Sequence, residues 1–189
     1  MKFCSQCGAT VSLQVPIDDD RERHVCSACE TIHYINPKVI VGCLPVVGDR
    51  ILLCKRAIEP RYGKWTLPAG FMENGETSAA GAARETWEEA AAKAIDLVLY
   101  RIFDVPHISQ VYLFYRCGIE NDAFGVGPES LDSGLFSEEQ IPWDELAFPV
   151  VREMLREFLD DRRAGQYPIR NSVIEYPRRK SSAAGPVWN

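Results

Sequence analysis

The sequence predicts an α/β domain with a mixed β-sheet, preceded by a small cysteine-rich segment. Apolar residues alternate with polar ones along several short segments, as in strands, and recur every three or four positions in two longer segments, as in helices. Two Cys-x2-Cys pairs near the N-terminus indicate the small segment. We therefore expect a small unit over residues 1–34, the α/β domain over residues 37–165, and a polar tail over residues 166–189 that is disordered or docks on a partner subunit.

The order of elements in the α/β domain follows from the hydrophobic pattern and the turn residues. A hairpin is expected where Gly48-Asp49 separates two apolar runs, and a second antiparallel pair turns near Pro106-His107. In chain order we expect strands over residues 39–47 and 50–56, a short strand over 63–70, a helix over 77–92, strands over 95–105 and 110–119, a short strand near 135–136, and a helix over 143–163.

Composition and charge limit the setting and the partners. Of the 189 residues, 46% are hydrophobic and 25% charged, as in a soluble globular protein. No apolar run approaches the roughly 18 residues that cross a bilayer, and the start of the chain has no room for a signal peptide, so we expect a cytoplasmic protein without a membrane partner. The net charge of −6 disfavours a general polyanion-binding surface. We expect small anionic substrates rather than nucleic acid.

Four of the seven cysteines form the pairs Cys4-x2-Cys7 and Cys26-x2-Cys29. This spacing is typical of a zinc ribbon, in which two turns close a tetrahedral site of four thiolates. A redox role is the alternative for a single pair, but two pairs at this separation favour zinc. Because four thiolates leave no open position for a substrate, we expect a structural Zn2+ that supplies folding energy to a segment with little core.

Glycine, glutamate and arginine follow a regular spacing between residues 70 and 89, at Gly70, Glu76, Arg84, Glu85, Glu88 and Glu89. On a helix, Glu85, Glu88 and Glu89 share one face within about one turn, and an apolar stripe forms on nearly the opposite side, from Ala80, Ala83, Trp87 and Ala91. Carboxylates this close repel each other, and a hard divalent cation such as Mg2+ removes the repulsion. The pattern predicts a metal site; a solvated acidic helix face is the alternative.

This pattern resembles the signature of the Nudix hydrolases, G-x5-E-x7-R-E-U-x-E-E-x-G-U, where U is a bulky apolar residue. The six positions above match at the correct spacing. The chain departs from the signature at Thr86 and Ala92, which occupy apolar positions, and at Ala91, where the family has glycine. These departures affect helix packing and the end of the helix, and none removes a ligand. The resemblance implies an α/β/α sandwich that cleaves a diphosphate linked to a nucleoside.

The resemblance also implies roles for the residues of the signature. Glu85 and Glu89 are the expected ligands of Mg2+ (or Mn2+), with Glu88 as the third and a backbone carbonyl at residue 69 or 70 completing the shell. Arg84 is expected to orient the carboxylates by hydrogen bonding. Glu76 is expected to cap or pair at the start of the helix.

The general base and the substrate contacts are less defined. Glu129, in a Gly/Pro-rich loop that could close over the substrate, is the candidate base, and Glu85 is the alternative. A plain surface acid is an equally good interpretation of Glu129. Arg56, Arg61 or Lys64 could contact phosphates, and an aromatic residue of the strand over 110–119, Tyr112 or Phe114, could stack on a base, although a position in the strand core is the alternative.

Over most of its length the chain also resembles zinc-ribbon Nudix proteins typified by plant chloroplast FAD/ADP-ribose pyrophosphohydrolases. The segments that carry this resemblance lie in both units: Phe3-Cys4-x2-Cys7-Gly8, residues 32–38, Ile58-Glu59-Pro60, residues 65–73 and residues 127–131. The resemblance implies hydrolysis of FAD to FMN and AMP, or of ADP-ribose to AMP and ribose 5-phosphate. It also implies a homodimer.

Two alternative functions stay open. An NADH pyrophosphatase or NAD-cap-removing enzyme also combines a zinc ribbon with a Nudix domain, but that group carries an S-Q-P-W-P-F-P-x-S run, of which residues 109–114 here share only Ser109-Gln110. The other alternative is a non-catalytic nucleotide- or nucleic-acid-binding module. Binding of nucleic acid through the ribbon needs a basic face, and residues 1–34 contain more acidic than basic side chains.

Overall fold

The computed structural model describes residues 1–175. The chain divides into two units, Met1–Pro37 and a larger one that begins at Lys38. The N-terminal unit is a three-stranded antiparallel sheet of β1 (Val11–Gln14), β2 (Arg23–Cys26) and β3 (Ile32–His33). Its buried apolar residues are Cys4 and Cys26, so the unit has almost no hydrophobic core.

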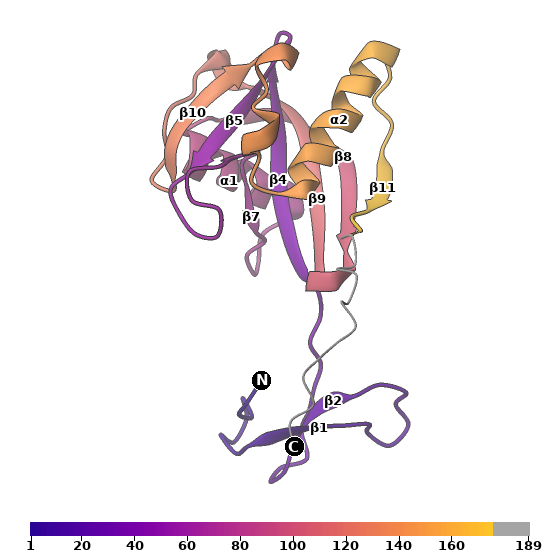
Figure 1. Cartoon of the computed structure of the whole chain (residues 1–189). Helices are drawn as coiled ribbons and strands as arrows, with labels where there is room; N and C mark the ends of the chain where they lie inside the picture. The colour runs from indigo at the N-terminus through magenta and orange to yellow at the C-terminus, as the bar shows by residue number, and fades with distance from the viewer. Residues whose placement is uncertain (176–189) are drawn as a thin grey trace, which may run out of the picture. The chain divides into compact units, whose positions relative to one another are not determined.

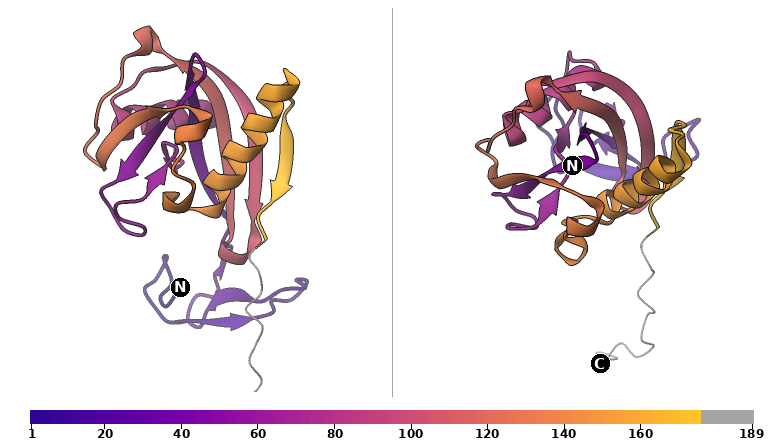
Figure 2. Two further views of the ribbon diagram at one scale, coloured as in Figure 1. Left: turned by 45° about the horizontal axis from the view of Figure 1, so that its top comes forward. Right: turned by 90° about the horizontal axis from the view of Figure 1, so that it is seen from above.

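The larger unit is built on a mixed sheet with the strand order β10-β5-β4-β9-β8-β11, with β6 pairing β5 and β7 pairing β4 (Figure 1). Strands β4 and β9 run parallel at its centre, and β8 pairs β9 antiparallel. The right-hand view of Figure 2 shows the long strands bending through an arc. The strands are β4 (Lys38–Val47), β5 (Arg50–Arg56), β6 (Trp65–Thr66), β7 (Ala69–Phe71), β8 (Ala94–Val105), β9 (Gln110–Ile119), β10 (Ser130–Phe136) and β11 (Arg170–Val173).

Two helices, α1 (Ser78–Ala90) and α2 (Pro149–Ala164), cover opposite faces of this sheet (Figure 1). Helix α2 begins later than the predicted residue 143. Pro149 occupies its first turn, and a residue before proline is driven out of helical geometry, so Phe148 is extended (φ −134°, ψ 144°). The residues before it form single 3₁₀ turns, η3 (Glu138–Gln140) and η4 (Trp143–Glu145); two others, η1 (Pro106–Ile108) and η2 (Glu120–Asp122), follow β8 and β9.

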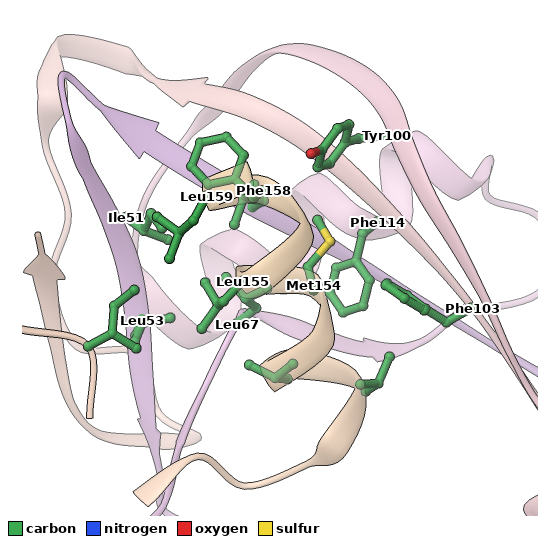
Figure 3. Close-up of a cluster of buried hydrophobic side chains, with 14 of the residues drawn as sticks. Ile51, Leu53, Leu67, Tyr100, Phe103, Phe114, Met154, Leu155, Phe158 and Leu159 are labelled. Atoms are coloured by element: carbon green, nitrogen blue, oxygen red, sulfur yellow. The ribbon is translucent and has the colours of Figure 1, made fainter. Parts of the chain in front are cut away.

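The main hydrophobic core lies between the sheet and α2. Met154, Leu155 and Phe158 of α2 pack against residues from β4, β5, β8 and β9, including Phe103 and Phe114 (Figure 3). Smaller clusters pack on the α1 side, where Ala82 meets Val41 and Cys43 of β4. In the described residues, no helix is long and apolar enough to cross a membrane.

The predicted tail enters the fold in its first part. Residues 170–173 form β11, which pairs in parallel with β8, Arg170 opposite Arg101. The fully buried guanidinium of Arg101 donates to the Pro168 carbonyl (2.7 Å) and to Asp161 Oδ2 of α2 (2.5 Å), and Arg170 pairs with Asp161 Oδ1 (2.7 Å). These charges tie the start of the tail to α2 and the sheet. The prediction for residues 176–189 lies outside the described residues.

Candidate active site

Helix α1 presents its glutamate-bearing face to the sheet. The Thr77 side chain caps the helix by accepting a hydrogen bond from the Ala80 N–H (3.1 Å). Gly81 allows close approach to β4, because a Cβ there would lie 2.8 Å from Val41 Cγ2. Glu85 and Glu89 follow on the same side and are only 7% and 4% exposed.

The apolar stripe on α1 lies on the outer face. Trp87 is 60% exposed, and Ala80 and Ala91 are exposed too. The small residues Gly81 and Ala82, together with Thr86, whose hydroxyl donates to the Ala82 carbonyl (2.8 Å), form the buried face instead. Side-chain size rather than hydropathy therefore decides which face meets the sheet.

Strand β7 packs directly on the two buried carboxylates. The Ala69 N–H donates to Glu89 Oε2 (3.3 Å), and a Cβ on Gly70 would lie 2.3 to 2.4 Å from the carboxylate atoms of Glu85. A larger residue in place of the glycine that opens the sequence pattern would thus displace the Glu85 carboxylate from its present position.

Arg84 connects the other acids of the pattern. Its guanidinium donates to Glu76 Oε1 (2.9 Å), Glu85 Oε1 (2.8 Å) and Glu88 Oε2 (2.8 Å), and also to the carbonyl of Phe71 (3.1 Å). The hydrogen bonds from Arg84, supported by the Glu73 N–H, lower the pKa of Glu76 to about 2. This is the pattern of contacts that an orienting arginine would make.

Nearby positive charge offsets the burial of the two carboxyls only in part: Arg84 pairs with Glu85, and the charge of Arg56 acts on Glu89 without an ion pair. Burial raises the pKa of Glu89 to about 8; the Ala69 N–H opposes this shift, and the charges of Glu85 and Glu129 add to it. Burial also raises the pKa of Glu85, against the hydrogen bond from Arg84. Both carboxyl groups can be ionised together only when a cation lies beside them, and their oxygen atoms are hard ligands. This set of donors fits Mg2+ or Mn2+.

Glu129 lies within electrostatic reach of Glu85 and Glu89, since its charge raises the pKa of both. Its side chain is exposed, and its backbone carbonyl accepts a hydrogen bond from the Ala57 N–H (2.9 Å). The Gly127 N–H donates to the Glu89 carbonyl (3.1 Å), so the loop is attached to both α1 and the end of β5.

Two of the predicted substrate-binding residues come together. Arg56 is 8% exposed, its Nε donates to the Pro60 carbonyl (2.9 Å), and its guanidinium lies 5.2 Å from the centre of the Phe148 ring. Its charge also influences the pKa of Tyr112, which burial raises. Arg61 is exposed in the loop after β5 with a left-handed backbone (φ 73°). Sequence reasoning missed Phe148, which reaches this region only through the fold.

Tyr112 is half-buried rather than wholly in the core. Its ring stacks on Phe114 at 6.0 Å, and its hydroxyl donates to Gln110 Oε1 (3.0 Å). Phe114 itself is fully buried, which removes it as a surface for stacking a base.

The four cysteines of the N-terminal unit form a tight cluster. Their sulfur atoms all lie within 4.8 Å of one another, with Cys4 3.7 Å from Cys29 and Cys7 3.5 Å from Cys26. Tetrahedral zinc with bonds of about 2.3 Å places sulfurs about 3.8 Å apart. Hydrogen bonds from the Thr31 hydroxyl and N–H lower the pKa of Cys29 to about 6, whereas the pKa of Cys7 is raised to about 12, because the hydrogen bond from the Ala9 backbone is outweighed by those with Cys26 and Cys29. The cluster fits a structural Zn2+.

In residues 1–175, these cysteines are the one set of three or more such ligands gathered this closely. The three glutamates of α1 are spread more widely, because Glu88 is half-exposed and turned to Arg84. Because Arg84 binds only Oε2 of Glu88, a cation at Glu85 and Glu89 that used Glu88 as a third ligand would take its other oxygen or turn the side chain.

Family models match both units: the zinc-ribbon model described as Nudix N-terminal covers residues 2–35, and the NUDIX domain model covers residues 36–158. An α/β/α fold with an acidic helix facing a glycine strand, joined to a four-cysteine ribbon, defines a zinc-ribbon Nudix enzyme. The chain belongs to the Nudix hydrolase family. The predictions of the family, of the fold class and of a hydrolase are confirmed.

A solved structure, a NUDIX hydrolase from Nitrosomonas europaea, is 51% identical with a TM-score of 0.88, and the match covers 92% of this chain and 99% of that one. The NAD-capped RNA hydrolase NudC of Chromobacterium violaceum is 28% identical over 165 residues, or 84% of this chain and 58% of that protein. Nudix hydrolase 19, chloroplastic, of Arabidopsis thaliana is 34% identical over 104 residues, which is 52% of this chain and 22% of that protein. The chain thus spans less than two thirds of these two curated relatives.

Proposed function

We propose that this chain hydrolyses the diphosphate bond of a nucleoside diphosphate-linked compound, with FAD or ADP-ribose as the leading substrates and AMP as a product. The observation that carries the proposal is the pair of buried carboxyls, Glu85 and Glu89, held against β7 with their pKa values raised. Buried acids whose pKa values stay raised despite the positive charges near them suit a site that receives a divalent ion together with phosphates. The resemblance to the chloroplast enzymes supports the choice of substrates.

Glu85 and Glu89 would hold Mg2+ (or Mn2+), with Glu88 as a third ligand. When bound, the ion would shield the charge of the two phosphates and stabilise the charge that develops during displacement. Arg84 keeps the carboxylates oriented through its hydrogen bonds to Glu85 and Glu88.

The remaining residues would bind the substrate and move the proton. Glu129 takes a proton from the attacking water, with Glu85 as the alternative base. In residues 1–175 neither Nη group of Arg56 has a hydrogen-bond partner, so both can donate to a phosphate. Tyr112 and Phe148 offer half-buried rings for a base, and Arg61 is placed to contact the more exposed part of the substrate.

Hydrolysis of an NAD cap is the second candidate, because relatives such as the NudC of Chromobacterium violaceum bear that activity in their names. Residues 109–114 share only the serine–glutamine pair of that group's run, which disfavours it. A non-catalytic binding module is the weaker alternative. We further propose a homodimer in the cytoplasm that acts on a small nucleotide.

A substrate panel tests these candidates. The purified chain is incubated with Mg2+ and FAD, ADP-ribose, NADH, NAD-capped RNA, a diadenosine polyphosphate or 8-oxo-dGTP, and products are identified by mass. We expect AMP with FMN or ribose 5-phosphate. A comparable kcat/KM for 8-oxo-dGTP would overturn the dinucleotide assignment, higher values for NADH or capped RNA would favour the second candidate, and no hydrolysis at all would leave a binding module.

A further inference from the structure

Gly127 contacts the last turn of α1 in a way that no other residue type permits. Its N–H donates to the Glu89 carbonyl (3.1 Å), and a Cβ built on it would lie 1.7 Å from the carbonyl oxygen of Glu88. That oxygen belongs to the backbone of a helix and cannot turn aside as a side chain can. To reach an ordinary contact of 3.4 Å, the loop would have to retreat from α1 by about 1.7 Å.

The same contact sets the position of Glu129. The Ser130 N–H donates to the Gly127 carbonyl (3.1 Å) and closes a turn with Pro128 at its second position, where the fixed φ of proline suits a turn. The Glu129 carbonyl accepts from the Ala57 N–H at the end of β5. The backbone of Glu129 is therefore held between α1 and β5.

We propose that Gly127 is a positioning residue for the general base: by resting on the backbone of Glu88 and Glu89, it sets the distance from the Glu129 carboxylate to the metal-binding carboxylates. This inference rests on the proposed function, in which Glu129 receives the proton of the attacking water. A general base must lie within hydrogen-bond reach of that water, and a misplacement of about 1 Å can cost about 10²-fold in rate.

Gly125 provides a matched control in the same loop. Its N–H also donates to α1, to the Ala90 carbonyl (2.7 Å), but a Cβ there would meet only Ala91 Cβ at 3.5 Å, an ordinary contact. Alanine at position 125 should therefore leave the loop in place, whereas alanine at position 127 should displace it.

The test is a double-mutant cycle in the full chain with Mg2+ and the substrate that the panel shows to be hydrolysed fastest. Gly127→Ala should lower kcat about 10- to 100-fold with KM within about threefold, and Gly125→Ala should stay within about twofold of wild type. In a Glu129→Gln background, Gly127→Ala should change kcat less than about twofold, because there is no base left to position.

The outcomes separate this inference from the proposed function. If Gly127→Ala lowers kcat equally with and without the Glu129 carboxylate, it acts through α1, and the positioning role is overturned. Full activity of Gly127→Ala would overturn it too. A loss below about tenfold in Glu129→Gln would remove both the general-base assignment and the positioning role, while hydrolysis of the dinucleotide would still stand. Should Gly127→Ala fail to fold, Pro128→Gly loosens the turn without a clash; it should cost about three- to tenfold, again only when Glu129 is present.

Discussion

Glu89 of α1 and Asp161 of α2 are equally buried, each 4% exposed, but their pKa values shift in opposite directions. Burial raises the pKa of Glu89 to about 8, and the nearby acids Glu85 and Glu129 reinforce the shift. Burial opposes ionisation of Asp161 too, but hydrogen bonds from Tyr100, Arg101 and Arg170 outweigh it and lower the pKa.

The difference teaches that partners, and not burial, decide what a buried acid does. On α2 the chain supplies its own cations, and the acid becomes part of the structure. On α1, Glu89 has like charges nearby, one main-chain N–H, and the charge of Arg56 without an ion pair, and under the proposed function further positive charge arrives as a metal ion with the substrate. Each acid can be neutralised separately, which allows the contrast to be tested.

The largest effect is expected from Glu89→Gln. Loss of a metal ligand should lower kcat by about 10³-fold or more, while the melting temperature stays about equal, because glutamine still accepts the Ala69 N–H and is neutral, like the Glu89 carboxyl whose pKa burial raises to about 8. Steady-state kinetics and thermal unfolding measure both. Glu153→Gln, at an exposed acid of α2, is the control and should leave both unchanged. Near-normal kcat in Glu89→Gln would remove the metal assignment.

Asp161→Ala should give the reverse result. It leaves the Arg101 guanidinium, which is fully buried, without one of its two ion-pair partners, and breaking a buried pair costs about 3–5 kcal/mol. Urea unfolding should show this loss, while kcat per folded molecule remains close to wild type. The neighbouring exposed pair provides the control: Asp160→Ala should cost less than about 1 kcal/mol. Equal losses at the two positions would contradict the role of the buried network.

The stabilising role of ionised Asp161 should also appear in the pH dependence of the free energy of unfolding. The pKa of Asp161 is lower in the folded than in the unfolded state, where it is about 3.9, so the unfolded chain binds the proton more readily. Its contribution is therefore complete above about pH 4 and is lost as the pH falls through the folded pKa. The free energy of unfolding, measured by urea from pH 7 downward, should decline less steeply in Asp161→Asn than in wild type. Parallel curves would show that Asp161 does not titrate in this way.

The smallest effect concerns the end of α1. Ala91 adopts a left-handed conformation (φ 46°, ψ 33°) at the C-cap, which costs a non-glycine residue about 1 kcal/mol. Ala91→Gly should therefore raise the melting temperature by about 2–4 °C with kcat unchanged. Ala80→Gly, inside the same helix, should lower it by a similar amount. A lower melting temperature in both variants would show that the C-cap is not strained.

Elements that follow from a local pattern of residues could be predicted from the sequence. Features that depend on contacts between residues far apart in the chain could not. The bounds of β5 and β9 and the spacing of the α1 acids follow from alternation and helical period, and they agree with the structure. The exposure of Trp87 could not be predicted from hydropathy, because hydropathy does not show that the small residues Gly81 and Ala82 pack closer to β4 than a tryptophan can.

Strand β11 shows the same limit. Its sequence, Arg-Asn-Ser-Val, has no alternation, and its pairing depends on Arg101, which is far away in the chain. Phe148 likewise approaches Arg56 only through the fold, and no sequence signal links the two residues.

The near-absence of an apolar core in the first 37 residues makes the folding of that unit a function of zinc supply. With zinc bound by its four cysteines, the free energy of unfolding of this unit rises with the free ion concentration by RT ln(1 + [Zn2+]/Kd), whereas the hydrolase unit keeps its own core. Under zinc starvation one chain would thus lose one of its two folds and expose the thiols of Cys4 and Cys26, which are buried in the folded ribbon.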